Sequence, residues 1–499
     1  MLAVGVWGTI WPMSRESRRL VWALRALALL LVGLTLAAPL FPEEVAWGLW
    51  PAVYVSAGWR WALAGLTVGL VLCGDCSAIG RRAAVAVGAW RVRRQRRAQQ
   101  RSSRQQAHAL RFGIALAMLA PFYLFRLRHL RWGDAYILVH AIPHPEVRLT
   151  YNWQAPLDVF IHAKAWALGH QLFGWPDAMP VYWLLSTLAG GVFVWVLLGL
   201  ADWLGRDRVE QWMIAGLVLS LGLMQLFFGY VENYSLMTVG VLVYIWLALR
   251  AQRGEIALVW PATALALTHA FHPSTIVLAP SLLYLAWQMR SVRPERTEAM
   301  AVAGRSSRPS PGRRIFWQVV GPYALVFAGV VALMTAGNHG LAALFGADAP
   351  GGGDRRWFVP LFETSTRWEH YTMFSPGHLL DIINEQLLVA PTIWPTLALT
   401  ALFARRRVPW RDPMLRLLLI MALLYLVLTL TWNPDYGGQR DWDLFAPASL
   451  PAALLAGVAL ARGLPERPAL AAAGRALIAV QAFRLALWIY QNTLPWTPT

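Results

Sequence analysis

Charged residues are scarce in this sequence, and lysine is almost missing from it. Only 14% of the 499 residues are Asp, Glu, Lys or Arg, and 57% are hydrophobic. Soluble domains carry about a quarter charged residues, so this composition excludes an ordinary soluble domain. The formal net charge is +18, and Lys164 is the one basic residue that is not an arginine. The arginine clusters lie beside apolar runs, which favours membrane anchoring over nucleic-acid binding.

Cysteine is equally scarce, with two residues, Cys73 and Cys76, in the segment CGDC. A redox or metal-binding CxxC needs a supporting fold or a second pair of ligands. The sequence offers neither, so we interpret the pair as incidental. The apolar run that follows RESRR has no small-residue cleavage site, so we expect it to be a first membrane anchor rather than a signal peptide.

Long apolar runs make up most of the chain, and they recur at about 18–22 residues, the length that crosses about 30 Å of hydrocarbon. They are far too long for barrel strands, so we predict an all-α, polytopic transmembrane helical bundle of about 11–13 spans. The spans are placed near 20–40, 48–72, 110–126, 180–203, 211–228, 233–250, 257–272, 274–289, 316–336, 378–402, 414–431, 444–462 and 470–490. We divide the chain into N-terminal extra spans with a basic loop (1–109), a catalytic core (110–450) and C-terminal spans (451–499).

Three basic segments set the expected topology, at 81–104, 290–314 and 404–412. Because arginine-rich loops stay in the cytoplasm, we place them and the N-terminus inside a plasma (inner) membrane. The long loops at 127–179 and 337–377 then face outward, as does 432–443. Polar stretches such as RWGD, GYVENY, HAFHPS and NPDYGGQRDWD all fall on that outer side, although the arginines alone set the topology. This clustering predicts an extracytoplasmic active site in the cell envelope.

Asp134, in RWGDAY, follows closely after the span at 110–126. A carboxylate at the membrane surface beside apolar groups can act as a general base, or it can cap the helix that AYILVHAI suggests. Arg128 and Arg131 precede it on the side where arginine is normally sparse. They suit a lipid phosphate or, equally, lipid head groups in general. Further along this loop, 157–175 is predicted to form a surface helix or an ordinary loop helix, and it contains Asp158.

Two hairpin ends between spans hold further candidates. In FFGYVENY, Tyr230, Glu232 and Asn233 lie where an ionisable group is costly unless it is paired or functional. The alternative there is a turn cap. In THAFHPS, His269 and His272 lie beside a proline that breaks the helix. Two histidines beside a break favour a site over a satisfied interior histidine.

The segments GGGDRRWF and NPDYGGQRDWD complete the candidates. Arg355 follows three glycines in a loop that lacks the GK[ST] ending of a P-loop, so it is either a mobile substrate loop or a plain linker. Arg440 suits a phosphate, with Asp441 or Asp443 orienting it, and an internal Arg440–Asp443 ion pair is the alternative. No spacing demands a metal, because prolines break the helix that a zinc site in HAIPHPE would need.

This arrangement resembles the GT-C superfamily of integral-membrane glycosyltransferases. A span is followed by the acid of RWGD in a long outer loop, then by a surface helix, many spans and a second long outer loop. Over 110–450, the resemblance implies a polyprenyl-phosphate-linked sugar donor, a lipid, glycan or protein acceptor, and transfer with inversion. It gives the base role to Asp134. Many members have Asp-Asp or Asp-Glu where this chain has GDAY, so the second acid is Asp158 or Glu232. A divalent cation is left open, since some members use one.

A transporter or flippase of a lipid-linked or anionic substrate is the alternative. Such proteins place ionisable residues in mid-span, at broken helices in paired repeats. Here the charges lie at the outer ends and no repeat is visible, which favours an enzyme. A non-catalytic membrane protein that binds a polymer is a third class, in which replacing Asp134 would matter less than replacing loop surface residues.

Overall fold

The computed structural model describes residues 13–73, 99–144, 150–291, 311–345 and 357–496. In these ranges the regular structure is helical, apart from one isolated bridge between Phe358 and Trp432. The predicted all-α fold is confirmed. Much of two basic segments, at 81–98 and 292–310, lies outside the described residues.

Within the described ranges, eight helices are long and apolar enough to cross a membrane. They are α1 (Arg15–Ala37), α5 (Gln99–Leu124), α8 (Met179–Leu204), α10 (Ser235–Gln252), α14 (Pro311–Ala336), α17 (Pro413–Thr431), α18 with α19 (Trp442–Phe445 and Ser449–Gly463) and α20 (Arg467–Thr493). Shorter helices occupy other predicted spans, namely α3 (Ala57–Leu72), α9 (Arg208–Leu219), α11 (Val259–Phe271) and α12 (Ala279–Ser291). The predicted number of about 11–13 spans includes these shorter helices, each below the roughly 20 residues that cross a bilayer.

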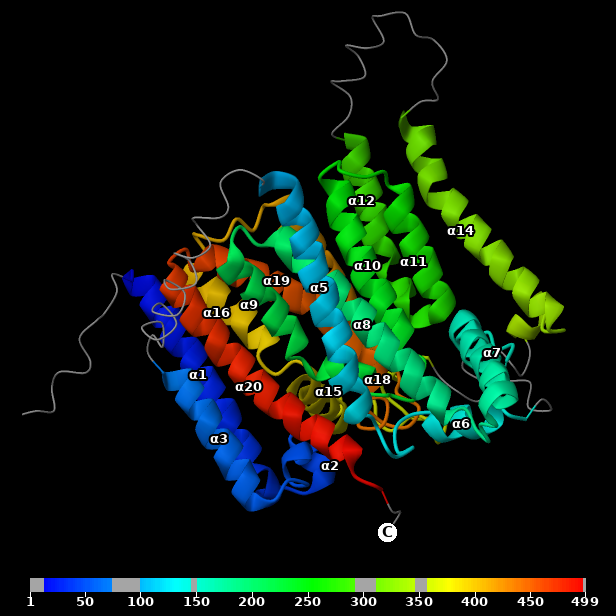
Figure 1. Cartoon of the computed structure of the whole chain (residues 1–499), viewed down its shortest axis with the longest axis horizontal. Coiled ribbons are helices and arrows are strands. Elements are labelled where there is room, and N and C mark those ends of the chain that lie inside the picture. Colours follow the sequence, from blue (N-terminus) through cyan, green and yellow to red (C-terminus); the bar gives the residue numbers. More distant parts are fainter. Residues whose placement is uncertain (1–12, 74–98, 145–149, 292–310, 346–356, 497–499) are drawn as a thin grey trace, which may run out of the picture.

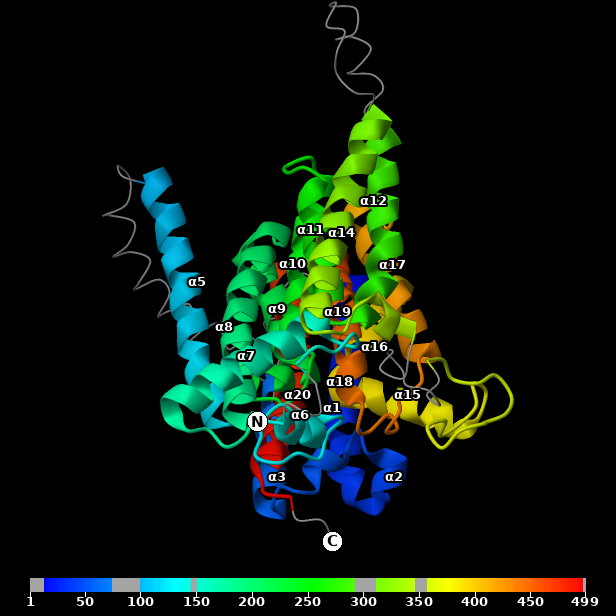
Figure 2. The same cartoon turned by 90° about the vertical axis from the view of Figure 1, so that its right-hand side faces the viewer.

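One predicted span, 378–402, is not continuous. It consists of α15 (Pro376–Val389) and α16 (Ile393–Ala404), which meet at 88°. Ala390 ends α15 and is followed by Pro391. Proline lacks an amide hydrogen and disfavours the helical conformation of the residue before it, so the helix cannot continue. α15 therefore lies across the end of the bundle, whereas α16 runs along it (Figures 1 and 2).

The short helices next to the polar segments gather at one end of the bundle. α6 (Ala135–Ala141), α7 (Pro156–Phe173), α15 and α18 lie toward the lower end in Figure 1, and Figure 2 shows the same grouping from the side. The C-terminal end of α12 and the N-terminal end of α14 lie toward the upper end. The membrane topology predicted from the arginine-rich loops stays a prediction.

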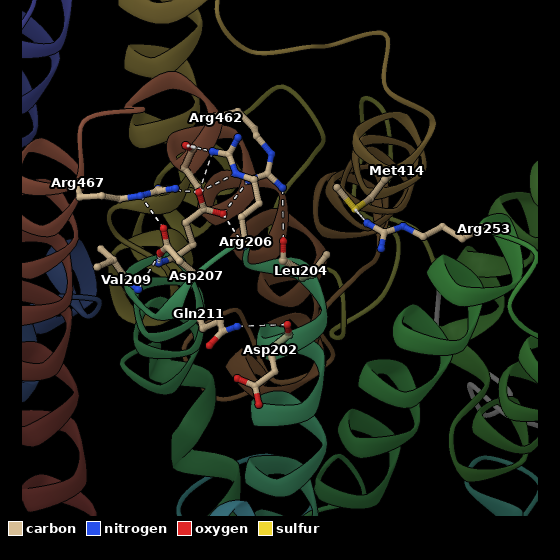
Figure 3. Close-up of polar contacts among 12 residues, drawn as sticks. Asp202, Leu204, Arg206, Asp207, Val209, Gln211, Arg253, Met414, Arg462 and Arg467 are labelled. Carbon is tan, nitrogen blue, oxygen red and sulfur yellow. Dashed lines mark hydrogen bonds and ion pairs between the residues drawn. The ribbon is translucent and has the colours of Figure 1, made fainter. Parts of the chain in front are cut away.

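A buried carboxylate joins two helix corners at the upper end (Figure 3). Glu210 is 0% exposed and accepts hydrogen bonds from Arg206, Arg462 and Arg467 at 2.9, 2.8 and 2.7 Å. Burial alone would raise its pKa, but these guanidinium groups outweigh burial and lower the pKa to about 2. Asp207 caps α9 and pairs with Arg467 at 2.6 Å. The α8–α9 corner is thereby fixed to the α19–α20 corner.

The N-terminal helices pack onto the C-terminal helix. α1 and α3 both contact α20, and the three share an apolar cluster that includes Leu31, Val71 and Phe483. The boundary predicted between 450 and 451 falls in the first turn of α19, which packs against α9, α16 and α17. The three-part domain division stays a prediction. Cys73, at the end of α3, is disulfide-bonded, and Cys76 lies outside the described residues.

Candidate active site

Asp134 stands at the N-terminal end of α6, and its carboxylate does not cap that helix. It occupies the N-cap position without a side-chain capping hydrogen bond. Its Oδ1 instead accepts a hydrogen bond from the Tyr436 hydroxyl at 2.8 Å. Its backbone N–H donates to the carboxylate of Glu232. The structure therefore excludes the side-chain cap and leaves a partly exposed carboxylate held from two directions.

Gly133 allows the backbone before Asp134 to approach Glu232 closely. Its φ is +44°, and a Cβ built on it would lie 2.5 Å from Glu232 Oε1. Its amide donates to the carbonyl of Arg440 at 3.0 Å, and its carbonyl accepts from Arg440 Nη2 at 3.4 Å. A residue without a Cβ is needed here because both the backbone conformation and the space demand it. The first outer loop is thereby joined to the segment 433–443.

Glu232 and Asp443 form a buried acidic group beneath Asp134. Glu232 is 4% exposed and Asp443 is 1% exposed. The Tyr230 hydroxyl donates to Asp443 Oδ2 at 2.9 Å. Burial, with the charges of Asp443 and Asp134, raises the pKa of Glu232 well above its usual range. Burial and the charge of Asp443 likewise raise the pKa of Tyr230. Protonated forms are therefore favoured in this part of the site.

Tyr436 contacts three charged residues of the site, Asp134, Asp441 and Arg440. Besides its hydrogen bond to Asp134, its amide donates to Asp441 Oδ2 at 2.8 Å, and the Arg440 guanidinium lies 4.6 Å from the centre of its ring. Burial is the main reason that the pKa of Asp441 is raised. In the described part of the chain no ion pair joins Arg440 to Asp443, so the alternative of an internal salt bridge is not supported. Arg440 is exposed and available to an anion.

α15 contributes two more carboxyl groups, one helical turn apart. Asp381 accepts hydrogen bonds from Trp47 Nε1 at 2.9 Å and from the Gly438 amide at 3.0 Å. Glu385 is 3% exposed, and no described residue forms a hydrogen bond with either of its carboxylate oxygens. The sequence reasoning missed Asp381, Glu385 and Tyr436. Two acids spaced i, i+4 inside an apolar run were the available signal, because a true span rarely carries them.

The other residues predicted for this region lie at its edge. Arg131 pairs with Glu43 at 2.6 Å, rather than with the acidic group. Glu43 belongs to the N-terminal hairpin, the segment that connects α1 to α3. Arg128 has an exposed side chain. Asn233 is buried, and its backbone N–H donates a hydrogen bond to Glu232 Oε2 at 3.3 Å. Asn233 thus borders the site, whereas Arg131 fixes the first outer loop to the hairpin.

The two predicted histidines have different surroundings. His269 lies 2.8 Å from Thr275 Oγ1 and 2.9 Å from the Tyr323 hydroxyl, so both ring nitrogens have partners. His272 is buried, which lowers its pKa to about 4. Its ring packs against Tyr234 with centroids 5.0 Å apart.

Asp158 lies in α7, apart from Asp134, and is fully buried at 0% exposed. Its Oδ2 is 3.0 Å from His162 Nδ1. Of the two proposed second acids, Glu232 is the one that contacts the Asp134 backbone. Arg355, predicted to bind phosphate, lies outside the described residues. Across the ranges that are described, no three His, Cys, Asp or Glu side chains are arranged to hold a metal ion.

No family model matches this sequence, and no curated protein matches it significantly. Among solved structures, the chain is similar to one described as the crystal structure of ArnT from Cupriavidus metallidurans bound to undecaprenyl phosphate. The two chains share 14% identity over 77% of each, with a TM-score of 0.45. Because this overlap is loose, we infer the function from the site itself.

Proposed function

We propose that this protein is an integral-membrane glycosyltransferase of the GT-C type. It would move a sugar from a polyprenyl-phosphate donor to an acceptor hydroxyl at the extracytoplasmic face. The observation that carries the proposal is the side chain of Tyr436, which holds a carboxylate at its hydroxyl and a guanidinium over its ring. Tyr436 thereby holds Asp134 and Arg440 beside one another, at the edge of the buried acidic group of Glu232 and Asp443.

These two groups have complementary tasks in sugar transfer. The acceptor oxygen forms a bond to the anomeric carbon, and its proton passes to the Asp134 carboxylate. The bond between the anomeric carbon and the phosphate oxygen breaks, and its electron pair stays on that oxygen. Arg440, as an exposed cation, stabilises the charge that develops on the phosphate. Attack from the face opposite the leaving phosphate gives inversion.

An apolar groove suits the lipid part of such a donor. It lies between α8, α10 and α11, has a volume of about 470 Å³, and includes Leu188, Val239 and Leu267 in its lining. It extends along α10 from Leu236 to Leu247, or about 17 Å at 1.5 Å per residue. Leu236, at one end of this range, lies two residues after Tyr234, on which the charges of Asp443 and Glu232 act. An isoprenoid tail held there would bring its phosphate toward Arg440.

The broken α15–α16 pair is the one observation that favours a transporter. Broken helices that carry buried acids bind substrates and coupling ions in such proteins, and α15 carries Asp381 and Glu385. However, α15 lies across the lower end of the bundle instead of at its middle (Figure 2). Asp381 accepts a hydrogen bond from the Gly438 amide, so α15 contacts the segment that carries Arg440 and Asp443. The placement favours a surface active site.

The first experiment measures sugar transfer by the purified protein. It would be incubated with polyprenyl-phosphate hexoses and a total lipid and glycan extract, with and without EDTA. Asp134→Asn removes the base, and Asp177→Asn is the matched control. Asp177 also lies at this end and accepts a hydrogen bond from the Met179 amide at 3.0 Å, which an asparagine oxygen can equally accept.

We expect transfer by the wild type and by Asp177→Asn, and a loss of at least about a hundredfold in folded Asp134→Asn. Equal transfer by both variants would move the base to another carboxyl, whereas lipid-linked sugar flux without transfer would establish the transporter. Loss of transfer in EDTA would show a divalent cation. The orientation is tested separately, since Phe362→Cys, at an 81% exposed position, should react with an impermeant reagent from outside the cell and Arg406→Cys should not.

A further inference from the structure

A second polar group lies between α7 and α8, apart from the Asp134 site. It consists of Asp158, His162 and Tyr182, which are 0%, 3% and 0% exposed. The ring of His162 is stacked on Tyr182, with centroids 4.1 Å apart and an interplanar angle of 18°. α7 lies at the same end of the bundle as α6 (Figures 1 and 2). The Tyr182 amide donates to the Ala178 carbonyl, and the Ala178 amide donates to the Val139 carbonyl of α6 at 3.2 Å, so this group lies close to the helix that follows Asp134.

Asp158 fixes how His162 presents its ring. The Nδ1 atom lies 2.9 Å from the Asp158 carbonyl oxygen and 3.0 Å from Oδ2 of the same residue. Two acceptors at one ring nitrogen favour the tautomer with hydrogen on Nδ1, as in other aspartate–histidine pairs. Nε2 then carries a lone pair. The described residues supply no hydrogen bond to Nε2.

The remaining polar atoms of this group are unsatisfied. Among the residues that the structure describes, the Tyr182 hydroxyl has no hydrogen-bond partner, and the carboxylate of Asp158 accepts no well-formed hydrogen bond despite the contact of its Oδ2 with His162. A buried polar group without a partner is costly, so a cluster of them needs an explanation, and a bound ligand is one. The group offers one donor, at Tyr182, and acceptors at Asp158 and His162. A hydroxyl both donates and accepts, and it therefore matches the group.

We propose that Asp158, His162 and Tyr182 form a subsite that binds hydroxyl groups of the donor's sugar. This inference rests on the proposed function. Tyr182 donates to one sugar oxygen, while Asp158 and His162 accept from sugar hydroxyls. The subsite orients the sugar ring, and Asp134 carries the chemistry. It also gives Asp158 a role in binding in place of the second catalytic acid.

The test compares the binding of a panel of polyprenyl-phosphate hexoses with that of the polyprenyl phosphate that carries no sugar. Tyr182→Phe removes a single oxygen that has no partner in the free protein. Tyr425→Phe is the matched control, because the Tyr425 hydroxyl is also buried and unpartnered but belongs to α17. Dissociation constants would be measured in detergent for both lipids, alongside thermal unfolding of each variant without lipid.

We expect the wild type to bind one of the sugar-bearing lipids about tenfold tighter than the bare lipid phosphate, as one good hydrogen bond allows. Tyr182→Phe should lose this preference, bind the bare lipid as the wild type does, and be no less stable. Tyr425→Phe should keep the preference. If Tyr182 had only a structural role, Tyr182→Phe would weaken the binding of both lipids equally or of neither.

Two outcomes overturn the subsite. One is a wild type that binds the sugar-bearing and bare lipids equally. The other is a Tyr182→Phe variant that keeps the preference, which would mean that the group is filled by water alone. If the wild type binds neither lipid, the proposed donor class fails together with the subsite. Binding of lipid with an unchanged Tyr182→Phe refutes the subsite alone, so the two failures are distinguishable.

Discussion

Adding one methyl group at Gly133 should damage the site and the fold together. The backbone at Gly133 has φ +44°, and a side chain in this left-handed region costs about 1–2 kcal/mol. The new Cβ would also lie 2.5 Å from Glu232 Oε1. Glu232 is buried, so its carboxyl cannot swing into solvent, and it must release the Asp134 amide. An unpaired buried donor adds about 1–3 kcal/mol. The total for Gly133→Ala is about 2–5 kcal/mol.

Gly174→Ala separates the two contributions. Gly174 also has a positive φ, +68°, but a Cβ there meets nothing within 4 Å. This variant should lose only the conformational part, about 1–2 kcal/mol, and should transfer sugar normally. In Gly133→Ala the displaced loop should slow transfer by about a hundredfold, as expected from a shift of about 1 Å in a catalytic group.

The assay is denaturant-induced unfolding in detergent, followed by tryptophan fluorescence, together with transfer rates for both variants. Equal unfolding midpoints for Gly133→Ala and Gly174→Ala would show that Glu232 yields without cost. A wild-type transfer rate in Gly133→Ala would refute the idea that contact between Glu232 and the Asp134 backbone positions the base.

Tyr436→Phe keeps the ring beneath the arginine and removes the hydrogen bond to the base, so kcat should fall about tenfold or more with KM little changed, as transfer kinetics would show. Glu210→Gln leaves three guanidinium groups without their carboxylate and should lower the free energy of unfolding by about 3–5 kcal/mol. Glu255→Gln is the control, because its ion pair is half-exposed, and it should lower that free energy by under about 1 kcal/mol. The unfolding midpoints of the two variants test this difference. Burial raises the pKa of Glu232, so its protonated form stabilises the fold below its unfolded pKa, and this stability is lost as pH rises through the raised value. The melting temperature of the wild type should therefore fall relative to that of Glu232→Gln as the pH is raised, and parallel curves would contradict the assignment.

The apolar runs predicted the helices well, because spanning segments must be both long and uniformly apolar. A helix predicted at 157–175 is confirmed as α7, Pro156–Phe173, and the break predicted beside His272 separates α11 from the next helix. The break before Pro391 was overlooked, because the flanking residues are as apolar as those of a continuous span. Local polarity alone does not show that α15 turns across the bundle end.

The site was only partly predictable, since its residues come from segments up to about three hundred positions apart. Sequence placed Asp134, Glu232 and Asp443 on one side of the membrane, and the structure brings all three together. It could not show that Tyr436 would hold Asp134, because that contact depends on how two loops fold over each other. Arg131 was predicted to bind phosphate, but it forms an ion pair with Glu43 of the N-terminal hairpin instead. Side-chain contacts between segments that are distant in the sequence leave no local sequence pattern from which they could be predicted.

The hairpin before α3 has a consequence for how this protein can be divided. Glu43 accepts hydrogen bonds from Arg131 and Gln439, both at 2.6 Å, and the Trp47 indole reaches Asp381. The N-terminal segment thus supplies a wall of the active end, although the resemblance to glycosyltransferases begins only at residue 110. A shortened chain that starts there would keep its candidate base and lose the contacts that hold the surrounding loops. The N-terminal spans therefore belong to the same structural unit as the candidate site, and a shortened version of this protein that is meant to keep that site must retain them.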